Sequence, residues 1–141
     1  KEITNINKSN YSAQENLELV KNKEQINKNI LNKEFDLVDA RSKGRFQGKE
    51  PEPRKNMKSG NIKNSFNVPY NLLINEDHTF KSKQEIKNIF EKNIKSNLKE
   101  DIVFSCGSGV TAAVLALAYS LINNKYAPKL YDGSWAEYGK I

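Results

Sequence analysis

The sequence is poor in the residues that form cross-links and metal sites. A single Cys cannot form a disulfide within the chain, and one Cys with one His are too few for a zinc site, so we expect no metal. No apolar run approaches the ~18 residues that a membrane-spanning helix needs, so we expect no membrane partner. Arginine is also scarce, with three residues against 20 lysines, and all three lie between positions 41 and 54.

The abundant residues are Lys and Asn, with 20 and 19 of the 141 positions, and the formal net charge is +6. A basic chain can bind nucleic acid or another anionic surface. Here the lysines are spread through Asn-rich stretches, without the interleaved aromatic residues that bind single strands, so we expect no nucleic-acid partner. The length fits one domain, which we place at 11–141 after a polar, frayed segment at 1–10.

Two segments have the pattern of a capping box, in which a hydroxyl and a carboxylate bind the free amides at the start of a helix. The first, at 12–15, predicts a short helix whose periodicity is lost over 21–25, which we interpret as a loop insertion or a solvated turn. The second, at 82–85, precedes apolar residues at i, i+3, i+4 and i+8 and therefore predicts a helix with one apolar face.

Short apolar runs predict strands at 35–39, 66–69, 102–105 and 129–131. The run at 102–105 fits a buried central strand, and an Ala- and Leu-rich run predicts a buried helix at 111–122. The segment 43–65 is rich in Gly, Pro, Lys and Asn and has no periodicity, which is typical of a long loop. The alternation of strands and helices predicts an α/β fold with a mainly parallel sheet flanked by helices.

The only Cys lies in the predicted strand-to-helix turn at 105–111, at the sheet edge where ligands of parallel α/β folds bind. Gly107 and Gly109 let the backbone curl so that several amides point to one place, and the start of the helix adds its positive dipole end. Both effects stabilise a thiolate, so we expect Cys106 to be a nucleophile. The alternatives are a buried inert Cys and a phosphatase, which needs Arg six residues after the Cys, where this chain has Ala112.

Four stretches in the same order carry a family resemblance. They are 38–46, 50–54, 106–112 (Cys-Gly-Ser-Gly-Val-Thr-Ala) and 131–138 (Tyr-Asp-Gly-Ser-Trp-Ala-Glu-Tyr). Together they resemble the rhodanese superfamily, and within it the C-terminal catalytic domain of 3-mercaptopyruvate sulfurtransferases. The resemblance implies a rhodanese-like fold and a sulfurtransferase that moves sulfur from 3-mercaptopyruvate, through a Cys106 persulfide, to a thiol or cyanide. Pyruvate is released and no cofactor is expected.

The resemblance also implies roles for individual residues. Ser108 is expected to relay a proton, and the backbone of the loop is expected to bind the outer sulfur, through Gly107, Gly109, Val110 and Thr111. Arg45 and Arg54 are expected to bind the substrate carboxylate, because a planar guanidinium binds a carboxylate in a bidentate manner and Lys does not. Arg41, beside Asp39 at the predicted strand end, is expected to form a structural ion pair with a carboxylate of the loop.

Two features depart from the family pattern. The family's His-Ile-Pro-Gly-Ala stretch is replaced at 61–65, which we interpret as a turn with altered chemistry. Family members have two tandem domains, and a His and an Asp of the first domain serve the proton relay. His78 does not match that His and is expected to be a solvated loop residue. We therefore expect this chain to be the C-terminal half, with the first domain packed against it.

The resemblance leaves the partner and the donor open. An acceptor such as thioredoxin or a small thiol is expected, in a reducing compartment, the cytoplasm or the mitochondrion. Thiosulfate-preferring members place cationic residues where this chain has Gly107 and Ser108, which favours mercaptopyruvate. A thiosulfate sulfurtransferase and a non-enzymatic module that carries sulfur or binds a partner are the alternative functions.

Overall fold

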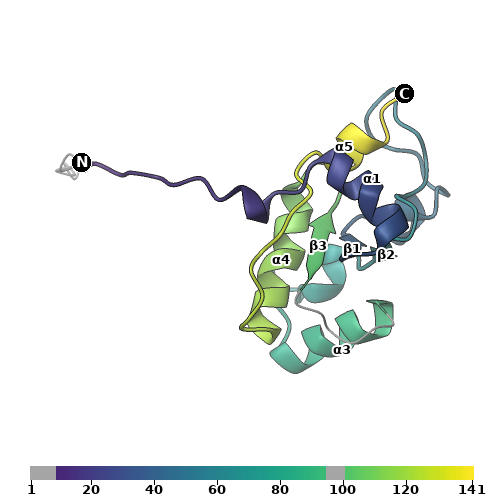
Figure 1. Ribbon diagram of the computed structural model, residues 1–141. Helices are drawn as coiled ribbons and strands as arrows, with labels where there is room; N and C mark the ends of the chain where they lie inside the picture. Colours follow the sequence, from purple (N-terminus) through teal and green to yellow (C-terminus); the bar gives the residue numbers. More distant parts are fainter. Residues whose placement is uncertain (1–8, 95–100) are drawn as a thin grey trace, which may run out of the picture.

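The computed structural model describes residues 9–94 and 101–141. Its elements in chain order are η1 (Leu17–Leu19), α1 (Lys23–Asn32), β1 (Asp36–Asp39), α2 (Lys43–Phe46), β2 (Phe66–Asn67), η2 (Tyr70–Leu73), α3 (Lys83–Ile94), β3 (Ile102–Ser105), α4 (Val110–Ile122) and α5 (Ser134–Tyr138). The predicted α/β fold is confirmed. Residues 9–16 are exposed and extend away from the domain (Figure 1).

Within the described residues, three parallel strands form one sheet in the order β2-β1-β3. Asp39 at the end of β1 is paired with Ser105 at the end of β3. All four residues of β3 are buried, as an interior strand requires. On its far side, β3 bonds to the segment around Leu130, which forms isolated bridges in place of the full strand predicted at 129–131.

The sheet separates two hydrophobic clusters, because side chains alternate between the two faces of a strand. Val38 of β1 faces the larger cluster, which is covered by α3, α4 and η2. Its neighbour Leu37 faces the smaller cluster, which contains Ile26 of α1 and Trp135 of α5. The helices accordingly lie on opposite sides of the sheet (Figure 1).

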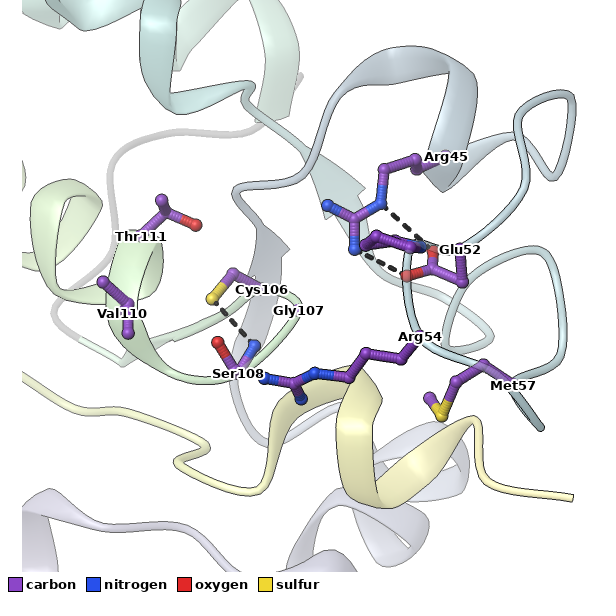
Figure 2. Close-up of a pocket in the computed structure, with 10 residues that line it drawn as sticks. Arg45, Glu52, Arg54, Met57, Cys106, Gly107, Ser108, Val110 and Thr111 are labelled. Carbon is purple, nitrogen blue, oxygen red and sulfur yellow. Dashed lines mark hydrogen bonds and ion pairs between the residues drawn. The ribbon is translucent and has the colours of Figure 1, made fainter.

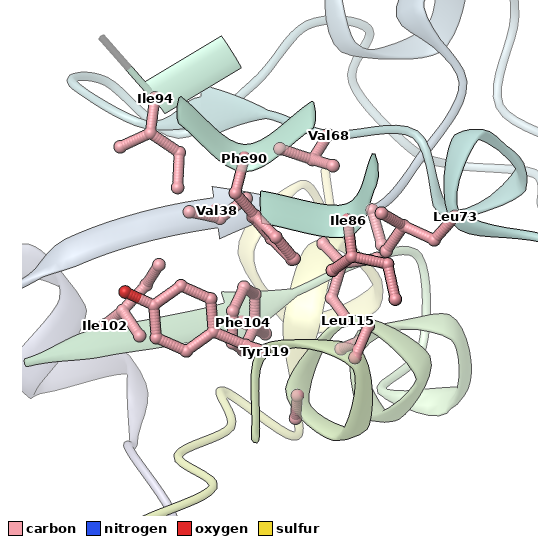
Figure 3. Packing of buried hydrophobic residues seen from close by; sticks show 14 of the residues in the cluster. Val38, Val68, Leu73, Ile86, Phe90, Ile94, Ile102, Phe104, Leu115 and Tyr119 are labelled. Carbon is pink, nitrogen blue, oxygen red and sulfur yellow. The ribbon is translucent and has the colours of Figure 1, made fainter. Parts of the chain in front are cut away.

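Aromatic rings fill the centre of the larger cluster. Phe90 of α3 lies edge-on to Tyr119 of α4 with a centroid separation of 5.1 Å, and it is 6.0 Å from the ring of Phe104 in β3. Tyr126 contacts Tyr119 and Phe104 in the same way. Edge-to-face pairs of this kind add to the gain from burial. They connect the strand that leads to Cys106 with both covering helices (Figure 3).

The helix predictions have mixed outcomes. The capping box at 82–85 is confirmed, since the Ser82 and Glu85 side chains each bind the other's amide. The capping box predicted at 12–15 is wrong, because the side chain that caps η1 is Asn16. The loop or turn predicted at 21–25 is also wrong: α1 begins there, with a capping box that uses Asn22 and Gln25 in place of Ser and Glu.

Two further differences concern the segments around the Cys loop. The predicted loop 43–65 contains the short helix α2, whose first turn is capped by the Ser42 hydroxyl. The predicted buried helix at 111–122 is present as α4, but only one side of it is buried. Its other side exposes Val110, Leu117 and Leu121.

In the part of the chain that the structure describes, no helix combines the length and the apolar character needed to cross a membrane.

The aromatic cluster predicts a large stability effect. Phe90 is fully buried, so Phe90→Ala should leave a cavity and lower the free energy of unfolding by about 3–5 kcal/mol. Leu31→Ala is the control, because this side chain is 82% exposed, and it should change stability by less than about 0.5 kcal/mol. Urea denaturation measures both changes, and equal effects of the two substitutions would contradict the assignment of the core.

Candidate active site

The Cys loop connects β3 to α4 at the carboxyl edge of the sheet. The Cys106 side chain follows directly from β3 and is 1% exposed. The curl of the loop depends on Gly109, whose φ of 84° is in the left-handed region that favours Gly. A Cβ at that position would also lie 2.8 Å from Oδ1 of Asp132. The two constraints explain why the turn before α4 contains Gly at this position.

The environment of the sulfur favours the thiolate. Burial raises the pKa of the Cys106 thiol, but hydrogen bonds from the Thr111 hydroxyl and from the amides of Ser108, Ala112 and Thr111 outweigh it. The net effect places the pKa of Cys106 below its ordinary value. The Ser108 amide lies 3.4 Å from the sulfur (Figure 2). Because these donors belong to the loop and the first turn of α4, the fold itself prepares the anion site.

Two stretches of the chain line one cavity of about 190 Å³. They are the Cys loop at 106–111 and the stretch 45–57, which we call the arginine segment. The residues around the cavity are Arg45, Glu52, Pro53, Arg54, Met57, Cys106, Gly107, Ser108, Val110 and Thr111. Seven of the predicted site residues thus lie together (Figure 2). The other three do not line the cavity: the Gly109 amide donates to Ser134 of α5, and Asp39 and Arg41 are buried.

A buried ionic network supports the arginine segment. The Arg41 guanidinium donates to both oxygens of Asp39 and, at 2.6 Å, to Oε1 of Glu52. Glu52 also accepts from Nη2 of Arg45 at 2.5 Å, and its side chain is only 4% exposed. Separating one partner from such a network leaves an unpaired buried charge, which is energetically unfavourable. The network therefore holds the loop in one conformation. Glu52 was not among the predicted site residues.

The two arginines of the cavity have different environments. Arg45 is held by Glu52 and packs against Gly107, where a Cβ would lie 3.0 Å from its Nη2. Arg54 is exposed, and among the described residues nothing forms an ion pair with it. Its guanidinium points across the cavity toward Ser108 (Figure 2). Within the part of the chain that the structure describes, the cavity therefore has one positive charge that forms no ion pair with a carboxylate.

Trp135 connects the arginine segment to the rest of the domain. Its indole amine donates to the carbonyl of Lys58 at 2.9 Å, across 77 positions of sequence. Its ring also lies 4.4 Å from the Arg41 guanidinium, a distance at which a cation–π interaction is favourable. The long loop that carries Arg54 is therefore tied to α5 through Lys58. Sequence reasoning assigned no role to Trp135.

The described residues contain no group of three or more His, Cys, Asp or Glu side chains that could hold a metal ion. His78 is exposed in the turn between η2 and α3 and does not line the cavity.

The sequence pattern of the rhodanese-like domain matches residues 21–140. The chain belongs to the rhodanese family. This confirms the resemblance seen in the sequence. The chain is 40% identical over 128 residues to the mouse (Mus musculus) 3-mercaptopyruvate sulfurtransferase, a match that covers 91% of this chain and 42% of the relative. It is also 40% identical over 129 residues to the thiosulfate sulfurtransferase of Rattus norvegicus, covering 91% and 43%. This rhodanese domain thus spans about two fifths of the length of these relatives.

Solved structures agree with the family assignment. The domain superposes on the structure of SseA from Escherichia coli, a 3-mercaptopyruvate sulfotransferase with the rhodanese fold. The TM-score is 0.69 and the identity 32%, and the match covers 89% of this chain and 45% of that one. It also superposes on the sulfur transferase subunit of yeast mitochondrial complex I with a TM-score of 0.71 and 34% identity, covering 86% and 43%.

The thiolate environment can be tested through Thr111. Thr111→Val removes a hydroxyl that lowers the pKa of Cys106 and keeps the shape, so the alkylation rate should reach its half-maximum at a higher pH. Thr111→Ser keeps the hydroxyl and should retain the wild-type profile. The measurement is the rate of Cys106 alkylation by iodoacetamide between pH 5 and 10. Coincident profiles for the Val and Ser variants would contradict the role of the hydroxyl.

Proposed function

We propose that this rhodanese domain is the catalytic part of a sulfurtransferase that takes sulfur from 3-mercaptopyruvate and holds it as a Cys106 persulfide. The observation that carries the proposal is a thiol of lowered pKa in a cavity that also contains two arginines. A nucleophile and a cationic site for a carboxylate thus lie within one small volume, as transfer from an anionic sulfur donor requires.

In the first step, the Cys106 thiolate attacks the sulfur of mercaptopyruvate. A sulfur–sulfur bond forms and the carbon–sulfur bond breaks. The electron pair of the broken bond goes to the departing carbon, which leaves as the enolate of pyruvate. The donor sulfur keeps its hydrogen, and the enolate takes up one proton. We propose that the Ser108 hydroxyl, at the cavity wall, relays this proton. The loop amides then bind the outer sulfur of the persulfide.

The arginines orient the donor. Arg54 has no carboxylate partner among the described residues, so its guanidinium is free to bind the substrate carboxylate in a bidentate manner. Arg45 keeps its Nε and Nη2 on Glu52, which leaves the rest of its guanidinium to contact the substrate. We therefore assign the main anchoring role to Arg54 and a directing role to Arg45.

In the second step, an acceptor thiolate attacks the outer sulfur and restores the Cys106 thiolate. Thioredoxin or a small thiol is the acceptor that we propose, and cyanide serves in an assay, where it leaves as thiocyanate. Both steps exchange one sulfur between nucleophiles, so the chain itself needs no external oxidant.

Thiosulfate is the second candidate donor, because relatives of similar identity include thiosulfate sulfurtransferases. Gly107 and Ser108 favour mercaptopyruvate, since neither adds a positive charge for a dianion beside the sulfur. A kcat/KM that is higher for thiosulfate than for mercaptopyruvate would assign the domain to the second donor.

We further propose that the domain is the C-terminal half of a two-domain enzyme. The chain spans 42–43% of the relatives that it matches. The exposed apolar side of α4 starts at Val110 on the cavity wall and continues through Leu117 and Leu121. A contiguous apolar face of this kind is typical of a covered surface. A first domain placed there would border the cavity.

The persulfide itself can be detected directly. Incubation of the full-length protein with mercaptopyruvate should release pyruvate and add one sulfur, about 32 Da, to the peptide that contains Cys106. Cys106→Ser should show neither product, because its hydroxyl is not a comparable nucleophile. If the wild-type protein forms neither pyruvate nor the adduct, the proposed donor is wrong; if incubation with thiosulfate adds no sulfur to Cys106 either, the enzyme proposal is wrong.

The anchoring role predicts a selective defect in Arg54 variants. Arg54→Ala should raise the KM for mercaptopyruvate roughly 10- to 100-fold, because it removes a charge-assisted contact of about 1.5–3 kcal/mol. Arg54→Lys keeps the charge without the planar guanidinium, so its KM should lie between those of the wild type and Arg54→Ala. Steady-state pyruvate release measures KM, and Lys58→Ala, at an exposed neighbouring position, is the control with unchanged KM. An unchanged KM in Arg54→Ala would contradict the role.

A further inference from the structure

Ser134 is buried behind the Cys loop. It is the first residue of α5 and is fully inaccessible to solvent. Its φ is 48°, in the left-handed region that residues other than Gly, Asn and Asp adopt only under strain. A strained Ser at a buried position requires a compensating interaction. The compensation lies in its side chain.

The Ser134 hydroxyl satisfies two ends of the Cys loop at once. Its oxygen accepts from the amide of Cys106 at 3.0 Å and from the amide of Gly109 at 3.1 Å. The same hydroxyl donates to the carbonyl of Tyr131 at 2.8 Å. One oxygen therefore ties the first and the fourth residue of the loop together and fixes their separation.

The start of α5 binds the carbonyls of the same loop. The amide of Trp135 donates to the Cys106 carbonyl and the amide of Ala136 to the Gly107 carbonyl, both at 2.9 Å. With these loop groups engaged by α5, the amides of Ser108 and of the first turn of α4 are left to face the sulfur. The orientation of the loop amides and carbonyls thus depends on α5, whose Ser134 lies 28 residues after Cys106 in the sequence.

We infer that Ser134 is a positioning residue, whose hydroxyl holds the 106–109 turn in the curled form in which its remaining amides point at the Cys106 sulfur. Ser134 touches neither the cavity nor a substrate, since it is fully buried. It acts through the loop that it binds, in the way that supporting contacts fix the groups of a site. The effect of Ser134 on kcat rests on the proposed function, whereas its effect on the reactivity of the Cys106 thiol does not.

The experiment compares Ser134→Ala and Ser134→Gly in the full-length protein. Both remove the hydroxyl, and Gly also relieves the strain at the positive φ, so it is the variant expected to fold best. Ser105→Ala is the matched control: Ser105 is a buried serine next to Cys106 whose hydroxyl donates to the Ser134 oxygen at 3.5 Å and binds no amide of the loop, so its removal leaves both bonds from the loop amides to Ser134 in place. The readouts are the pH profile of Cys106 alkylation, followed by mass spectrometry, and kcat for pyruvate release.

Both Ser134 variants should shift the alkylation profile to higher pH and slow alkylation at pH 7 severalfold. They should lower kcat more than they raise KM, while Ser105→Ala keeps the wild-type profile. A wild-type profile in folded Ser134→Gly would overturn the inference, as would an equal shift in Ser105→Ala. If the shift occurs but the wild-type protein releases no pyruvate, the proposed function fails and the positioning role stands.

Discussion

The parallel pairing of β1 with β3 determines where the site forms. Asp39 and Ser105 end their strands opposite each other, and the Ala40 amide extends the pairing to the Ser105 carbonyl. The chain leaves the two strands at the same edge, so Arg41 follows one strand where Cys106 follows the other. The Cys106 thiol and the arginines, which are separated by about half of the sequence, therefore meet without a special connection.

The site is held by polar groups that are mostly buried. On one side, Asp39 and Glu52 hold two arginines in an ionic network. On the other side, α5 binds the amides and carbonyls of the Cys loop. Buried groups of this kind are costly to separate from their partners, so both loops keep one geometry in the absence of substrate. This preparation leaves the Cys106 sulfur and the Arg54 guanidinium to interact with a donor.

Local signals in the sequence account for the parts of the fold that were predicted correctly. The buried strand at 102–105, the capping box at 82–85 and the Gly-rich turn after the Cys each follow from adjacent residues. The start of α1 was missed, because its capping box uses Asn22 and Gln25, and its apolar residues are few among Lys and Asn. The helix propensity of such a segment is weak, and the packing of Ile26 into the smaller cluster stabilises the helix.

The sequence by itself determined the family, the position of the Cys and the segment that carries the arginines, because each is a motif of consecutive residues with its own chemistry. Only the tertiary structure decided that Glu52 pairs with Arg41 and Arg45 while Arg54 has no ion-pair partner among the described residues, and that Ser134 binds the Cys loop and Trp135 binds Lys58. These contacts join residues 28 and 77 positions apart. No local pattern specifies such pairs, since they form only when the sheet brings the ends of its strands together.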